Sequence, residues 1–329
     1  MSQNRVEVSA DKAIFAMLAV MTGITLASGS DLATKWLSDQ MSIWQLQLMR
    51  SVIGAALLAA AVLIANKDAS LIAINGVTVF IRSFLMAISF LTYFIAIGIL
   101  PIAIVAAGLF SSPLFTVFFG RFILKEKVGL FRISFAFIGF FGVVLVLQPG
   151  TTEFEPALLW PLGCGFSYAL TNTYTRKYCL EENPLALSFW LSVLFAVIGL
   201  IGMIGFSFST IGPEGSNFVN HPPLMPDPTV LGVAVGIGIC SIAMHFFLAT
   251  AYQNAPASLL APLEYVYLPL VIFGGIFFFG EQPTSTAYLG IAVIVFSGIV
   301  IAWREQRVGA RKKPKRRRPK LHRKQPDYY

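Results

Sequence analysis

A segment in the first half of the chain recurs, in altered form, near its end. Pro101–Glu126 reads PIAIVAAGLFSSPLFTVFFGRFILKE, and Pro256–Glu281 reads PASLLAPLEYVYLPLVIFGGIFFFGE. Each copy opens with a proline, carries a second proline (Pro113, Pro269) inside an apolar run, and closes with a glutamate at the same distance from the opening proline. A repeat of this length is the mark of a duplicated structural unit, so the chain is predicted to be a duplication.

The repeated unit is a set of membrane spans. Each copy is followed by a further apolar run, residues 129–148 and 287–303, of about the twenty residues that cross a bilayer as a helix. Hydrophobic residues make up 56% of the chain and charged residues only 12%, which indicates a polytopic membrane protein. The runs lack the alternation of barrel strands, so the spans are predicted to be helices.

The chain divides into ten expected spans, five in each half. The first half is residues 12–148 and the second 158–303, with a leader at 1–11, a linker at 149–157 and a basic tail at 304–329. The long connection 208–228, rich in Pro, Gly and Asn, is expected to be a surface loop. The expected spans are Lys12–Leu37, Trp44–Ala65, Gly76–Gly98, Ile102–Leu124, Gly129–Gln148, Leu158–Tyr178, Leu185–Ser207, Thr229–Tyr252, Ala257–Phe279 and Thr284–Trp303.

Charge sets the expected orientation. Twelve of the 24 Lys and Arg residues lie in 304–329, and cationic segments beside spans stay in the cytoplasm. An even number of spans then places both termini in the cytoplasm, with the protein in the inner membrane. The five-span halves come out opposite in orientation, which predicts an all-α polytopic fold of two inverted five-helix repeats. The tail is expected to be largely disordered and to attract anionic lipids rather than nucleic acid.

Three stretches carry a family resemblance: GSDLATKWL with WQLQLMRSVIGAALL, then PLFTVFFGRFILKEKVG, then LPLVIFGGIFFFGEQPT. They resemble the EamA family of the drug/metabolite transporter superfamily, over residues 12–303. The resemblance implies a ten-helix carrier of small organic metabolites that alternates between inward-facing and outward-facing states. Its substrate would lie between the two halves.

Polar residues inside spans are the site candidates, because a charge in hydrocarbon costs on the order of 3 kcal/mol. Asp31 and Arg50 each lie about six residues from the outer end of their spans, roughly 9 Å deep. They can pair with each other. Two readings stay open, a structural lock and a substrate-facing or gating role.

Glu264 and His245 repeat this pattern about 10 Å from the inner face. Glu264 follows Pro262, whose missing N–H loosens the helix beside a cavity. A glutamate there is suited to take and release a proton during transport. The alternative is a carboxylate permanently paired with His245 or Arg82.

Aromatic residues supply the remaining candidates. Tyr265 and Tyr267 lie between Pro262 and Pro269 in an expected irregular helix, where they can line a cavity together with Asn172. Other span tyrosines also qualify, although tyrosines near span ends commonly anchor the interface. These others are Tyr93, Tyr168, Tyr174 and Tyr252.

The predicted function is an inner-membrane secondary transporter that moves a small organic metabolite by alternating access, with proton coupling as an option. Alternatives are import of a cofactor-type metabolite such as riboflavin or S-adenosylmethionine, export of amino acids, and, in a different class, a receptor or channel. An enzyme is not predicted, because the three histidines are scattered and no carboxylates sit at ligand spacing. The three cysteines predict neither a disulfide framework nor a metal site, and no cofactor is expected. Expected partners are the substrate, the bilayer and a homodimer mate.

Overall fold

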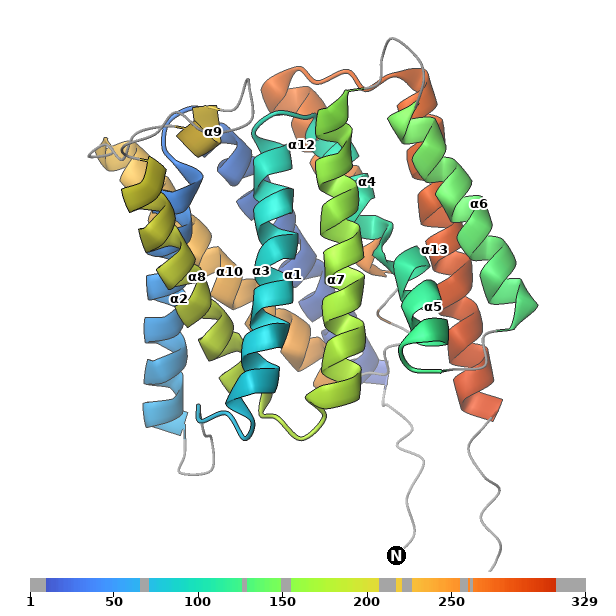
Figure 1. The fold of residues 1–329 in the computed structure, drawn as a ribbon, viewed down its shortest axis with the longest axis horizontal. Coiled ribbons are helices and arrows are strands. Elements are labelled where there is room, and N and C mark those ends of the chain that lie inside the picture. Colours follow the sequence, from blue (N-terminus) through green and yellow to red (C-terminus); the bar gives the residue numbers. More distant parts are fainter. Residues whose placement is uncertain are drawn as a thin grey trace, which may run out of the picture.

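The computed structural model describes residues 10–65, 71–125, 129–148, 155–206, 217–220, 227–254, 260 and 263–311. Within these ranges the chain is helical and contains no strand (Figure 1). Six of the described helical segments are long and apolar enough to cross a membrane, and three shorter apolar helices accompany them. The predicted all-helical membrane architecture is confirmed at this level.

The first half follows the expected spans closely except in the fourth. Helices begin and end within two residues of the predicted limits elsewhere, but the fourth span is two helices joined at Ser111 rather than one. The helices are α1 (Ala10–Leu37), α2 (Ile43–Ala65), α3 (Gly76–Ile97), α4 (Ile102–Phe110), α5 (Ser112–Phe122) and α6 (Leu130–Leu147).

The second half begins with a short 3-10 turn, Pro156–Leu158, and ends in a helix longer than predicted. α13 continues eight residues past the predicted end of the last span, to Arg311, and the rest of the tail, residues 312–329, for which disorder is predicted, lies outside the described residues. The helices are α7 (Leu159–Tyr178), α8 (Pro184–Phe206), α9 (Asn217–Asn220), α10 (Pro228–Asn254), α12 (Tyr267–Phe279) and α13 (Ser285–Arg311).

Both copies of the repeated segment contain a break. In the first copy Pro113 lies in the first turn of α5, where its missing N–H needs no partner, and the Ser111 N–H bonds the Gly108 carbonyl at 3.2 Å. In the second copy α12 begins at Tyr267, after a turn in which the Val266 N–H bonds the Leu263 carbonyl at 3.0 Å. The irregular helix expected around Tyr265 and Tyr267 is therefore present among the described residues.

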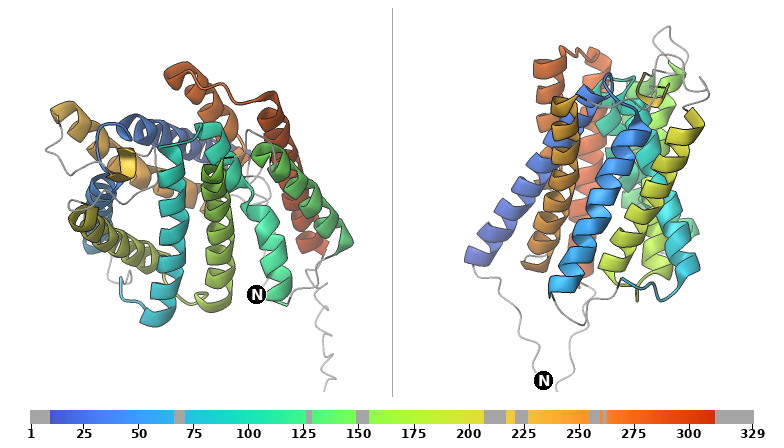
Figure 2. Two further views of the ribbon diagram at one scale, coloured as in Figure 1. Left: turned by 45° about the horizontal axis from the view of Figure 1, so that its top comes forward. Right: turned by 90° about the vertical axis from the view of Figure 1, so that its left-hand side faces the viewer.

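Helix pairing between the halves is reciprocal (Figures 1 and 2). The first span of the first half packs on the third of the second, α1 on α10, and the third of the first half packs on the first of the second, α3 on α7. The second spans pack together, α2 on α8, and so do the fifth spans, α6 on α13. Figure 1 shows α2 and α8 at one edge of the bundle and α6 and α13 at the other.

The loop between α8 and α10 is not a simple surface loop, and this corrects the prediction. Its described part, α9, places Phe218 and Val219 in the core with 1% and 2% of their surface exposed. The Val219 carbonyl accepts a hydrogen bond from Trp44 Nε1 at 3.1 Å, and Phe218 packs against Gly98. The composition of residues 208–228, rich in Pro, Gly and Asn, gave no sign that Phe218 and Val219 are buried.

The crossing of α4 and α7 depends on glycines. A Cβ at Gly165 would collide with the Gly108 carbonyl oxygen and lie 2.5 Å from Ser111 Oγ. Two residues earlier on the same helix, a Cβ at Gly163 would meet only Thr92 Cγ2, at 3.7 Å. Close backbone approach of this kind is how membrane helices gain packing energy without a hydrophobic driving force.

We expect Gly165→Ala to lower the free energy of unfolding by about 1–3 kcal/mol, because the opposing atom is backbone and cannot turn aside. Gly163→Ala is the matched control, and its melting temperature should stay at or above that of the wild type. Thermal unfolding in detergent micelles measures both. Equal melting temperatures for the two variants would contradict the glycine crossing.

Candidate functional site

Asp31 lies at the centre of a hydrogen-bonded network that joins the two halves. Its Oδ2 accepts hydrogen bonds from the Tyr93 hydroxyl, at 2.8 Å, and from the Tyr267 hydroxyl. The two tyrosine oxygens are themselves 2.6 Å apart. Tyr93 and Tyr267 are 4% and 6% exposed. Helices α1 and α3 of the first half and α12 of the second thus meet at one carboxylate.

Aromatic rings surround this network on the side of the helix breaks. Phe110, the last residue of α4, stacks on Tyr267 with ring centroids 5.7 Å apart and tilts toward Tyr265 at 5.2 Å. Counted from the opening proline of each repeat, Phe110 and Tyr265 occupy equivalent positions. The two broken helices therefore touch at their breaks, and the described structure brings together Asp31, Tyr265 and Tyr267 of the predicted site.

Arg50 lies beside the network without closing on it. Its guanidinium sits over the Phe94 ring, 4.9 Å from the centroid, and Phe94 in turn packs edge-on against Tyr93 at 5.5 Å. Arg50 and Asp31 interact electrostatically. Between these two described residues there is no ion pair within 4.0 Å. The direct pair that the sequence suggested is replaced by tyrosine hydroxyls on Asp31 and an aromatic ring under Arg50.

A second polar group gathers around Tyr168 of α7. Tyr168 lies near the Asn172 side chain and within electrostatic range of both Glu264 and Arg82. Glu264 is partly buried. Arg82 Nη1 donates to the Leu187 carbonyl at 3.4 Å. Glu264 and Asn172 are thus both neighbours of Tyr168, whereas the His245 side chain lies outside the described part of α10.

The sequence did not single out a clamp at the end of the bundle that carries the α12–α13 connection. Lys35 Nζ pairs with Glu281 Oε1 at 2.7 Å and also donates to the carbonyls of Leu100, at 2.7 Å, and Ile97, at 3.3 Å. Glu281 accepts the Ile102 N–H through both oxygens, at 3.1 and 2.9 Å. The lysine thus caps the carbonyl end of α3 and the glutamate the amide end of α4, each with the sign that the helix dipole favours.

A smaller contact of the same kind lies at the opposite end. Glu182, in the turn between α7 and α8, accepts the N–H groups of Ile74 and Asn75 at 3.0 and 2.7 Å. Its exposed fraction is 8%. A carboxylate of the second half therefore holds the start of α3, which belongs to the first.

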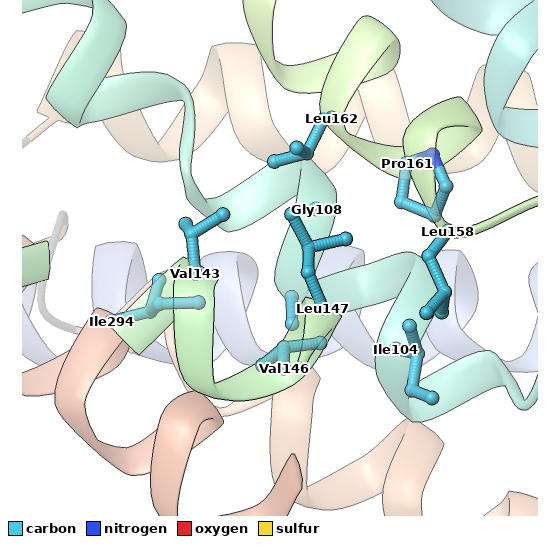
Figure 3. Close-up of a pocket in the computed structure, with 10 residues that line it drawn as sticks. Ile104, Gly108, Val143, Val146, Leu147, Leu158, Pro161, Leu162 and Ile294 are labelled. Carbon is cyan, nitrogen blue, oxygen red and sulfur yellow. The ribbon is translucent and has the colours of Figure 1, made fainter. Parts of the chain in front are cut away.

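A pocket where α4, α6, α7 and α13 meet is apolar throughout (Figure 3). Ile104, Val143, Pro161 and Ile294 face it from the four helices, and every residue that lines it is apolar or glycine. Such a lining offers no side-chain hydrogen bond to a polar metabolite. The Asp31 network is therefore the better candidate for recognition.

Comparison with known proteins places the chain as a whole in a family. The model of the EamA-like transporter family matches residues 14–148 and again residues 155–303. The chain belongs to the EamA-like transporter family. The resemblance found in the sequence is thereby confirmed, and the protein is a membrane transporter.

Its relatives include named metabolite carriers. An S-adenosylmethionine uptake transporter of Rickettsia felis is 23% identical over 89% of this chain and 94% of its own. A riboflavin transporter of Vibrio cholerae is 29% identical over 58% of this chain and 59% of its own. A crystal structure that is 19% identical shares the fold, with a TM-score of 0.58 over 89% of this chain and 98% of that one.

We expect Tyr267→Phe to lower the free energy of unfolding by about 1–3 kcal/mol, because it leaves the buried carboxyl group of Asp31 short of one hydrogen bond. Tyr265→Phe is the control. Its ring contacts the same Phe110, but its hydroxyl is outside the Asp31 network. Unfolding in mixed detergent micelles compares the two, and a larger loss for Tyr265→Phe would contradict the network.

Proposed function

We propose that this protein is a secondary carrier of the inner membrane that moves a cofactor-type metabolite, of the kind exemplified by S-adenosylmethionine or riboflavin, by alternating access. The observation that carries the proposal is the meeting of two broken helices, one from each half, at the Asp31 network. Broken helices at the interface of two repeats are where secondary transporters bind substrate.

The proposal includes ten spans arranged as two inverted repeats, with domain limits at 12–148 and 158–303. Reciprocal packing supports it, since α1 on α10 mirrors α3 on α7, as expected for two units related by a two-fold axis. The first residues of α1 and the last of α13 lie at the same end of the bundle (Figure 1). We assign that end to the cytoplasm from the cationic residues after Trp303, which we also propose to contact anionic lipids. A homodimer is part of the proposal that rests on the sequence alone.

The clamp of Lys35 and Glu281 acts in this proposal as an outer gate that is closed in the structure. It joins α1, α3 and α4 of the first half to the α12–α13 connection of the second. Opening the bundle at this end would separate those elements and expose the carbonyls and amides that the clamp satisfies.

We expect Glu281→Gln to shift the protein toward a state open on the outside. Cys164, 1% exposed in α7, is the reporter, in a background with Cys179→Ser and Cys240→Ser. Labelling by a membrane-impermeant thiol reagent added outside should accelerate about fivefold, equivalent to a loss of roughly 1 kcal/mol from the closed state.

The matched control for the gate is Glu155→Gln, an exposed carboxylate at the same end. Its labelling rate should equal that of the parent. If Glu281→Gln labels no faster than Glu155→Gln, the clamp is a structural tie and does not gate access.

Transport itself is tested by uptake into proteoliposomes containing the purified protein, with S-adenosylmethionine and riboflavin measured by mass spectrometry. Saturable accumulation above protein-free vesicles supports the carrier. Absence of uptake of both compounds, in either direction of an imposed proton gradient, contradicts the proposed substrate class.

Glu264 is the proposed proton carrier. Its carboxylate lies within electrostatic range of the Tyr168 and Tyr265 hydroxyls. We expect Glu264→Gln to abolish stimulation of uptake by a proton gradient while exchange of internal for external substrate continues, because exchange needs no net proton movement. Glu181→Gln, an exposed carboxylate in the α7–α8 turn, is the control. Retained stimulation in Glu264→Gln would assign Glu264 a structural role.

A further inference from the structure

The carboxylate at the centre of the site has one oxygen still available. Both hydrogen bonds to Asp31, from Tyr93 and from Tyr267, end on Oδ2. Among the described residues nothing donates to Oδ1. A carboxylate offers about four acceptor positions, so half of this one is open to an incoming donor.

The guanidinium of Arg50 is open in the same way. Its contacts in the described structure are the face of Phe94, at 4.9 Å, and the field of Asp31. No hydrogen-bond acceptor from the described residues lies against its donors. A guanidinium presents five N–H donors in a planar fork that fits a carboxylate in two-point fashion.

The two open groups are opposite in sign and near each other, yet no ion pair within 4.0 Å joins them in the described structure. A direct ion pair between Asp31 and Arg50 would satisfy both charges, and hydrocarbon surroundings strongly favour such a pair. The tyrosines instead hold Asp31 on α1, and Phe94 holds Arg50 on α2. Asp31 and Arg50 are therefore two groups of opposite sign that lie within electrostatic range of each other without pairing, which matches a ligand that carries a positive and a negative group side by side.

We propose that the substrate carries an α-amino-acid head group, with its ammonium donating to Asp31 Oδ1 and its carboxylate accepting from the Arg50 guanidinium. This rests on the transport function proposed above and narrows it. S-Adenosylmethionine has such a head group, whereas riboflavin has neither the ammonium nor the carboxylate. The rings of Phe110 and Tyr265 adjoin Tyr267, and aromatic surface of this kind is what a flat heterocycle stacks on.

The test measures uptake into proteoliposomes of three probes: S-adenosylmethionine, its decarboxylated analogue and riboflavin. The first two share the adenosyl, sulfonium and amine groups and differ in the carboxylate alone. We expect the wild type to take up S-adenosylmethionine with a KM at least tenfold lower than that of the analogue, because a site built to bond a charged group discriminates strongly against its loss. Riboflavin should be a poor substrate.

Arg50→Gln should reduce this tenfold preference to within about twofold, mainly through the KM of S-adenosylmethionine, because the two-point contact with the carboxylate is lost. Arg50→Lys retains the positive charge but not the forked donor geometry of the guanidinium. Its preference for S-adenosylmethionine should therefore lie between that of the wild type and that of Arg50→Gln. Asp31→Asn should raise the KM of both amine-bearing probes. Arg121→Gln, an exposed arginine at the end of α5, is the matched control and should keep the full preference.

The outcomes separate the two proposals. Equal uptake of S-adenosylmethionine and its analogue by the wild type overturns the head-group inference and leaves the carrier in place, as does uptake of riboflavin alone. An unchanged preference in Arg50→Gln also overturns it. If Arg50→Gln does not elute as a single species, Arg50→Lys is measured in its place. Its preference for S-adenosylmethionine over the analogue then decides whether the head-group inference holds. Uptake of none of the three probes overturns the inference and the proposed substrate class together.

Discussion

The hydrocarbon core of a bilayer holds no water, so a polar group there must find its hydrogen-bond partner within the protein. This constraint governs the arrangement of the described helices. A helix satisfies its own backbone, so most of the chain spans as unbroken helices. Where helices end inside the bundle, polar side chains from other segments meet their backbone groups. The carbonyl end of α3 receives Lys35 and the amide end of α4 receives Glu281, while Tyr267, the first residue of α12, donates its hydroxyl hydrogen to Asp31. The chemically useful residues are concentrated where the backbone is interrupted.

These interruptions also decide which helices must touch. Phe110 ends α4 and Tyr265 precedes α12, and the two rings are 5.2 Å apart at equivalent positions of the duplicated segment. Glycines let the neighbouring helix approach, as at Gly165 against the Gly108 carbonyl. Close backbone packing and broken helices therefore act together at the contact between the two halves. The first brings the halves together, and the second places polar atoms between them.

Local patterns predicted the helices well and their contacts poorly. Helix limits follow from apolar runs and from Gly and Pro, so α3 ends one residue from its predicted limit. The partners of Asp31 lie 62 and 236 residues away in the sequence, and no local pattern encodes which tyrosine reaches it. Glu281 was visible as the end of a repeat, but its contact with Ile102 depends on tertiary packing. The break at Ser111 could have been inferred from Pro113, because a proline inside a span loosens its backbone.

Phe218 adds a buried aromatic contact at the end of the bundle that carries α9. A duplicated chain with equivalent halves would have two states of equal energy, one open at each end. The ring of Phe218 is 1% exposed against Gly98, and burial of such a side chain stabilises by about 1.5–3 kcal/mol. In the alternating-access carrier proposed above, this burial would favour the state closed at the end that carries α9, and so give the transport cycle a preferred starting side.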